Sequence, residues 1–217
     1  MSRMMDRGLE DLAAILCKMG EIAYQAVLEA IDESFRGVDA YSRIRELSDA
    51  LSMMAEEVED KAFELIARFQ PVASDLRTIN SYMKIAYDFT RFGRYALDIS
   101  QANRKLGFIK DCGGFILDKI GEMSEKTLKM VRTSVKALKS HDAKLAEKIA
   151  ETEIEVDGMY EAFIDKLSGD VKMPGKCMIA GVLIARYLER IADHATYVCE
   201  SIVYIVTGKK VILDKIS

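Results

Sequence analysis

The chain has 217 residues, half of them apolar and 30% charged, a composition typical of a soluble globular protein that can bury a substantial core. Its net charge is −4, and no cluster of Lys or Arg lies beside aromatic residues, which argues against nucleic acid as the main partner. The longest apolar stretch, residues 177–185, is far shorter than the roughly 20 residues of a membrane helix, and the acidic N-terminus is unlike a signal peptide. We therefore expect a cytoplasmic protein without membrane insertion.

The residue types favour helices along the whole chain. Only 2 Pro and 13 Gly interrupt a sequence rich in Ala, Leu, Met, Glu, Lys and Arg. The apolar periodicity predicts six amphipathic helices, at residues 8–35, 42–69, 74–104, 115–139, 142–168 and 175–207. Pro71 and Pro174 each precede a helix, where a missing N–H costs nothing. We predict an all-α fold.

The order of elements repeats between the two halves of the chain. Each half contains two long helices, a Pro break and a third helix. The segment TRFGRYALDI at residues 90–99 aligns with ERIADHATYV at residues 189–198. We interpret this repeat as an internal duplication that gives two tandem antiparallel three-helix bundles, residues 1–107 and 108–217.

The four cysteines, Cys17, Cys112, Cys177 and Cys199, are scattered along the chain without a CxxC pair. This spacing is unlike a zinc site or a disulfide framework. We predict that all four are reduced thiols buried by helices, as is usual in the cytoplasm.

The last two predicted helices carry carboxylates beside their apolar stripes. At 100° per residue, Glu189, Asp193 and Glu200 lie together, roughly 100–140° from the core-facing line. On the preceding helix, Glu153 and Asp157 lie on one flank at i and i+4. If the two helices pack antiparallel, these carboxylates converge, and they repel strongly unless a cation lies between them. A hard cation fits such a site, with iron or manganese where carboxylates bridge.

Other interpretations of these carboxylates remain open. Acidic residues at i and i+4 are solvated on most helices, and Arg186 and Arg190 could neutralise these as surface ion pairs. Metal storage or redox chemistry would instead need the Glu-x-x-His pairing of di-iron proteins, which neither His141 nor His194 provides. No GxxxxGK[ST] loop and no GxSxG turn occurs, so we expect no enzymatic activity.

Two segments resemble the PhoU family of phosphate-uptake regulators: RFQPVASDLRTI at residues 68–79 and RYLERIADHATYVCESIVYIVTG at residues 186–208. The similarity covers nearly the whole chain. It implies paired three-helix bundles that carry multinuclear metal clusters. It also implies an adaptor that restrains phosphate uptake as a cytoplasmic negative regulator.

The resemblance further implies two partners, the ATPase subunit of the phosphate ABC transporter and a phosphate-sensing histidine kinase. Apolar flanks left exposed on such bundles would allow a homodimer. Related regulators of potassium or sodium–phosphate transport share the helical module, so a regulator of another ion transporter is the alternative.

In this family, E(D)xxxD motifs on the second and third helices of each bundle hold the metal. Carried over residue by residue, Glu153 and Asp157 match the motif on one helix of the second bundle. Glu189 and Asp193 match the other motif, and Glu200 extends that row. The resemblance implies iron as the foremost metal, with zinc, manganese or magnesium as alternatives.

The first bundle departs from this pattern. The corresponding positions hold no carboxylate and are Ser48, Ser52, Thr90, Arg94 and Gln101. An Arg inside a cation site opposes cation binding. We predict that the second bundle alone binds metal, although a shift of one helical turn would recruit Glu56, Glu59 or Asp88.

Overall fold

The computed structural model describes residues 2–169 and 173–214. These residues form seven α-helices and one 3-10 turn. In chain order the elements are α1 (Ser2–Arg36), α2 (Tyr41–Phe69), α3 (Ala73–Leu106), η1 (Ile109–Asp111), α4 (Gly114–Ser140), α5 (Ala143–Glu147), α6 (Ile149–Ser168) and α7 (Gly175–Thr207).

The helix ends lie where the local sequence stops a helix. Gln70 takes a left-handed φ of 46°, its N–H donates to the carbonyl of Ile66, and Pro71 follows directly. Gly208 ends α7 with a φ of 72°, a conformation that costs glycine nothing because it has no Cβ. Both ends lie at or within one residue of their predicted positions.

Two helices differ from the prediction. The first begins at Ser2, earlier than expected. The fifth, predicted as one element, is divided into α5 and α6 at Lys148. The side chain of Asp142 caps α5 by accepting a hydrogen bond of 3.0 Å from the N–H of Leu145. No Gly or Pro occurs between Asp142 and Lys148, so nothing in the local sequence requires the break.

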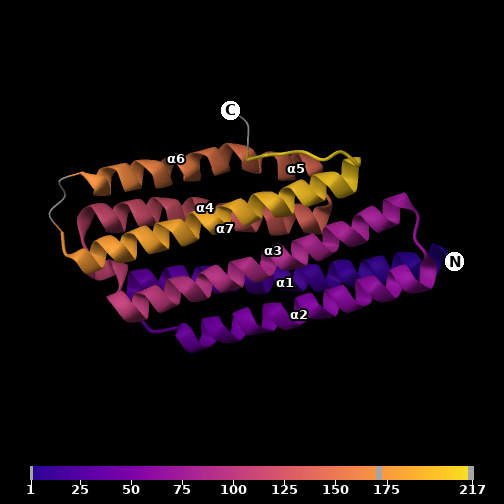
Figure 1. The fold of residues 1–217 in the computed structure, drawn as a ribbon, viewed down its shortest axis with the longest axis horizontal. Helices are drawn as coiled ribbons and strands as arrows, with labels where there is room; N and C mark the ends of the chain where they lie inside the picture. Colours follow the sequence, from indigo (N-terminus) through magenta and orange to yellow (C-terminus); the bar gives the residue numbers. More distant parts are fainter. Residues whose placement is uncertain (1, 170–172, 215–217) are drawn as a thin grey trace.

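The helices form two antiparallel three-helix bundles that lie side by side (Figure 1). The first consists of α1, α2 and α3, and the second of α4, α5 with α6, and α7. Between the bundles, α3 packs along α7 and α1 packs against α4. The predicted fold class, an all-α duplicated pair of bundles, is confirmed, while the assignment of two domains that divide at residue 107 stays a prediction.

One continuous apolar core runs through both bundles. Phe89 and Phe92 of α3 are fully buried in it, with ring centroids 5.8 Å apart. A Cβ placed on Gly20 of α1 would lie 3.3 Å from the Phe89 ring and 3.0 Å from Val135 of α4. Helices of both bundles therefore meet around Phe89. None of the described helices combines the length and the apolar character that a membrane span requires.

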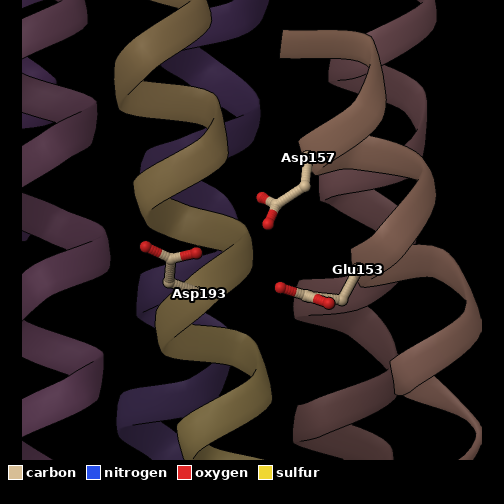
Figure 2. Close-up of side chains that lie close together, drawn as sticks. All are labelled: Glu153, Asp157 and Asp193. Atoms are coloured by element: carbon tan, nitrogen blue, oxygen red, sulfur yellow. The ribbon is translucent and has the colours of Figure 1, made fainter. Parts of the chain in front are cut away.

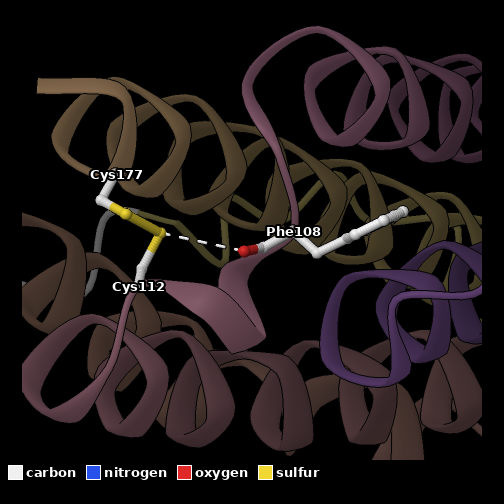
Figure 3. Close-up of a disulfide and its surroundings, with 3 residues drawn as sticks. All are labelled: Phe108, Cys112 and Cys177. Atoms are coloured by element: carbon white, nitrogen blue, oxygen red, sulfur yellow. Dashed lines mark hydrogen bonds between the residues drawn. A yellow bond between two sulfur atoms is a disulfide. The ribbon is translucent and has the colours of Figure 1, made fainter. Parts of the chain in front are cut away.

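The prediction of four reduced thiols is wrong for two of them. Cys112, just after η1, forms a disulfide with Cys177 in the first turn of α7, with Cα atoms 5.4 Å apart (Figure 3). The two residues are 65 positions apart and meet because the linker between the bundles returns to the start of α7. Isolated cysteines give no sequence signal for such a pairing. Cys17 and Cys199 are free.

We expect Cys112→Ser to lower the free energy of unfolding of the oxidised protein by about 2–4 kcal/mol, because a disulfide restricts the unfolded chain. Urea unfolding with and without reductant measures this, and reductant should remove the difference between the variant and the wild type. Cys17→Ser, which changes a free and partly buried thiol, is the matched control. An equal loss of stability in both variants would contradict a stabilising disulfide.

Candidate metal centre

Three of the five predicted ligands converge between α6 and α7. Figure 2 shows the carboxylates of Glu153 and Asp157 extending from α6 toward α7, which carries Asp193. One oxygen from each of the three carboxylates lies within 4.8 Å of the other two. Antiparallel packing of α6 and α7 thus brings these three carboxylates together, as the periodicity of the two helices predicted.

The three carboxyl groups are poorly solvated and repel one another. Glu153 is only 2% exposed, and burial, followed by the charges of Asp157 and Asp193, raises its pKa to about 8. Burial, followed by the charge of Asp157, raises the pKa of Asp193 to about 6. Burial also raises the pKa of Asp157, to which the protonated Glu153 donates a hydrogen bond. Near neutral pH the group therefore holds a proton that a cation can replace.

Glu189 lies beside this group but is paired with two arginines of its own helix. Nη1 of Arg186 lies 2.5 Å from Oε1 of Glu189, and Nε of Arg190 lies 3.4 Å from Oε2. Nη1 of Arg190 also lies 2.9 Å from Oδ2 of Asp193. Burial and the charge of Asp193 nevertheless raise the pKa of Glu189 to about 7. The ion pairs of Arg186 and Arg190 that the sequence suggested thus form. One of them engages Asp193, a member of the converging group.

Glu200, the fifth predicted ligand, lies farther along α7. It follows Asp193 by two helical turns, about 10 Å. Its Oε1 accepts a hydrogen bond of 2.7 Å from the backbone N–H of Leu213, in the segment after α7. Burial raises the pKa of Glu200. The structure therefore gives Glu200 a contact with the C-terminal segment and leaves it outside the group of three oxygens.

The neighbouring His194 faces the other bundle. Its Nδ1 lies 2.8 Å from Oδ1 of Asp88 on α3, and its ring lies beside those of Tyr95 and Tyr197. Asp88 is buried, which raises its pKa, while the hydrogen bond from His194 lowers it. His194 is thus a contact between the bundles and does not join the carboxylate group.

Asp214 is a charged neighbour that the sequence analysis missed. It lies in the segment after Gly208, and its charge contributes to the raised pKa values of Glu153, Asp157 and Asp193. Its Oδ1 is buried without a hydrogen-bond partner among the described residues. Helical periodicity could not place this residue, because the position of Asp214 depends on the path of the chain after α7.

The corresponding place in the first bundle is tightly packed. A Cβ on Gly93 of α3 would lie 3.1 Å from the Cα of Ser48 on α2. Ser52 and Thr90 donate hydrogen bonds within their own helices, to the carbonyls of Ser48 and Tyr87. Small residues therefore bring α2 close to α3 where the second bundle has converging carboxylates. That the second bundle alone binds metal stays a prediction.

The residues of the second bundle fit a hard cation. The converging donors are carboxylate oxygens, which such cations prefer. In addition, Oδ1 of Asp214 is buried without a hydrogen-bond partner in the described structure, and the buried Oε2 of Glu189 has only the 3.4 Å ion pair with Arg190. Buried carboxylate oxygens with few donors are unfavourable, and a nearby cation would offset that cost.

Comparison with known proteins gives the same fold and the same duplication. The family model of the PhoU domain matches the chain twice, at residues 16–102 and 120–202, once in each bundle. The chain is 32% identical to the phosphate-specific transport system accessory protein PhoU homolog of Clostridium acetobutylicum, over 98% of both chains. It is 27% identical to PhoU homolog 1 of Thermotoga maritima, over 94% of this chain and 89% of that protein.

Two solved structures of PhoU proteins have the same fold as this chain. The crystal structure of PhoU from Pseudomonas aeruginosa superposes with a TM-score of 0.86 and 26% identity, covering 94% of this chain and 99% of that one. The phosphate transport system regulatory protein PhoU from Streptococcus pneumoniae has the same fold, with a TM-score of 0.85, 23% identity and coverage of 96% and 99%. The resemblance noted in the sequence is confirmed, and the chain belongs to the PhoU family.

Proposed function

We propose that this protein is a metal-binding adaptor that negatively regulates phosphate uptake. Its role in phosphate transport is supported by membership of the PhoU family and by relatives named as accessory proteins of a phosphate-specific transport system. Metal binding is supported by one observation above all, the convergence of Glu153, Asp157 and Asp193 between two helices.

In this proposal, Glu153 and Asp157 of α6 and Asp193 of α7 hold the first cation. When bound there, a cation would supply the positive charge that the carboxylates of α6 and α7 require and could attract an oxyanion. With the repulsion removed, α6 and α7 keep a fixed spacing, and the surface that they present to a partner is defined. Iron fits carboxylate-bridged sites best, and zinc, manganese or magnesium are the alternatives.

A multinuclear cluster would also use the remaining predicted ligands. Glu189 is next to the group and would join it by exchanging both of its arginine partners, Arg186 and Arg190, for a second cation. Among the described residues, the one hydrogen bond of the Glu200 carboxylate is that from the N–H of Leu213 to Oε1, so Oε2 could bind a cation. In the metal-free protein, Arg186 and Arg190 supply part of the positive charge that the carboxylates require.

The proposed partner is the ATPase subunit of the phosphate ABC transporter, with a phosphate-sensing histidine kinase as a second one. We place the protein in the cytoplasm, as an adaptor without catalytic activity that can associate in pairs. The Cys112–Cys177 disulfide is the one observation that argues against this compartment, since disulfides are rare there. Labelling of free thiols in intact cells would show whether this bond forms.

We expect the double variant Asp157→Asn, Asp193→Asn to lose the rise in melting temperature that metal gives the wild type, because ligand binding stabilises only the folded state that holds it. Thermal unfolding of chelator-treated protein with added iron or zinc measures the shift, and elemental analysis gives the stoichiometry. The matched control replaces two exposed carboxylates elsewhere, Asp60→Asn and Asp118→Asn. Metal bound equally by both double variants would refute the centre.

The regulatory part of the proposal is tested separately. Adding the metal-loaded protein to a reconstituted phosphate transporter should lower its ATPase activity, and the double variant should have a weaker effect. Inhibition of a potassium transporter instead would favour the alternative regulator. Iron oxidation by the iron-loaded protein would favour metal storage or redox chemistry.

A further inference from the structure

The second half of α4 is basic in a chain whose net charge is −4. Residues 126–140, KTLKMVRTSVKALKS, contain five cations and no carboxylate. Four of these cations, Lys129, Arg132, Lys136 and Lys139, follow one another at intervals of three, four and three residues. All four are exposed. Their spacing places them on one face of α4, spread along about 15 Å of its axis.

These four cations line a groove between α4 and α1. The groove has a volume of about 450 Å³, and α1 contributes Glu21 and Tyr24 to its lining. We call the site formed by the four cations, Glu21 and Tyr24 the basic groove. The two helices touch at Val135 and Gly20, since a Cβ on Gly20 would lie 3.0 Å from the Val135 side chain. Two long and closely packed helices therefore form the walls of the groove.

The positive charge of the basic groove is only partly neutralised. Glu21 is the one carboxylate among the described residues that line it, and it pairs with Lys139. Lys129 and Lys136 form no ion pair with a carboxylate of the described residues. The groove therefore presents an excess of positive charge to solvent, which attracts an anionic partner.

Arg132 is positioned by a contact with α1. Its guanidinium lies over the ring of Tyr24, 5.8 Å from the ring centroid. The fold thus brings an aromatic ring to cations that have none beside them in the sequence. Because Arg132 already occupies this ring, the contact does not favour a nucleic acid, whose bases would need the ring for stacking.

The shape of the basic groove and the spacing of its cations favour one kind of anionic partner. Cations spread along about 15 Å do not converge on a single phosphate group. A membrane surface is flat, so its headgroups would not fill a concave site. An α-helix with carboxylates at i, i+3, i+7 and i+10 repeats the spacing of the four cations, and it can lie along two packed helices as a third helix does.

We propose that the basic groove is the docking site for an acidic helix of a partner protein in the phosphate transport machinery. This inference rests on the proposed function, because it assigns the surface through which the adaptor contacts its partner. Carboxylates of the partner helix pair with Lys129, Arg132 and Lys136, and Glu21 marks the end of the site because it repels a further carboxylate. The groove belongs to α1 and α4 and the metal centre to α6 and α7, so each site can be changed without the other.

The first test measures binding of a labelled helical peptide by fluorescence anisotropy at low salt. The peptide carries glutamates at i, i+3, i+7 and i+10, and a second peptide of the same composition carries them around the whole helix. The wild type should bind the first peptide about tenfold tighter or more, and Lys129→Glu, Lys136→Glu should remove this preference. The matched control makes the same charge change at exposed positions of α6 and α7, Lys166→Glu and Lys176→Glu, and should keep it. Equal affinity of the wild type for both peptides would overturn the proposal.

The second test uses the reconstituted phosphate transporter. The metal-loaded variant Lys129→Glu, Lys136→Glu should bind as much metal as the wild type, yet about tenfold more of it should be needed for the same inhibition of ATPase activity. Inhibition as strong as that by the wild type would overturn this inference and leave the proposed function standing. A wild type that does not inhibit would overturn the proposed function, and the peptide measurement would still decide whether the groove binds an acidic helix.

A third measurement separates the partner helix from a membrane. Wild-type protein and the variant Lys129→Glu, Lys136→Glu are sedimented with phosphatidylglycerol vesicles at the same low salt concentration. We expect neither to sediment with the vesicles, because the cations lie in a concave site. Sedimentation of the wild type alone would assign the groove to a membrane surface and overturn the docking of a helix.

Discussion

The metal-free protein should lose stability as the pH rises from about 5 to about 8. Glu153 has a pKa of about 8 in the folded protein, Glu189 about 7 and Asp193 about 6, whereas their ordinary values are 4.5, 4.5 and 3.8. The folded state therefore binds more protons than the unfolded state across this range. The stability that these protons supply is complete below about pH 4 and is lost as the pH rises through the raised values.

The three groups are coupled, so their separate shifts do not add, and we expect a loss on the order of 3 kcal/mol, which corresponds to about two pKa units at about 1.4 kcal/mol each. Urea unfolding of chelator-treated protein at several pH values measures it. Glu153→Gln should flatten the dependence and raise stability at pH 8, because the amide is neutral at every pH. Glu125→Gln, an exposed position on α4, should leave the dependence unchanged.

Bound metal should reverse this dependence of stability on pH. Protons compete with a cation for the same oxygens, so the metal-loaded protein should gain stability as the pH rises from 5 to 8. The alternative considered from the sequence is that Glu153, Glu189 and Asp193 are solvated. An increase in the stability of the metal-free protein over this pH range would support that alternative.

Phe89→Ala should lower the free energy of unfolding by about 3–5 kcal/mol, because the lost ring leaves a cavity that close-packed neighbours fill only in part. Phe89 lies where α3 meets α1 and α4, so the cavity weakens both bundles. Unfolding should therefore remain a single transition at a lower urea concentration. Far-ultraviolet circular dichroism, combined with hydrogen exchange in each bundle, measures this.

The matched control for this prediction is Phe63→Ala on α2. Phe63 is 59% exposed, so its removal should change stability by less than about 0.5 kcal/mol. Two separate transitions in Phe89→Ala, with only the first bundle destabilised, would contradict a core shared by the two bundles.

The sequence by itself determined the helices, the duplication and most of the candidate ligands. Each helix has an apolar stripe, and a stripe depends only on the angle between residues along one helix. The same angle placed Glu153 and Asp157 on one flank of α6 and Asp193 on a flank of α7. The end of α2 at Gln70-Pro71 depends on equally local properties of the backbone.

The tertiary structure decided which of these carboxylates come together. The rotation and axial offset of α6 against α7 bring one oxygen from each of three side chains within 4.8 Å, while Glu189 binds arginines and Glu200 binds Leu213. The path of the chain outside the helices decided the rest, namely the Cys112–Cys177 disulfide and the hydrogen bond from Leu213 to Glu200. Helical periodicity contains neither the offset between helices nor the course of a loop, since both are fixed by packing between residues distant in the sequence.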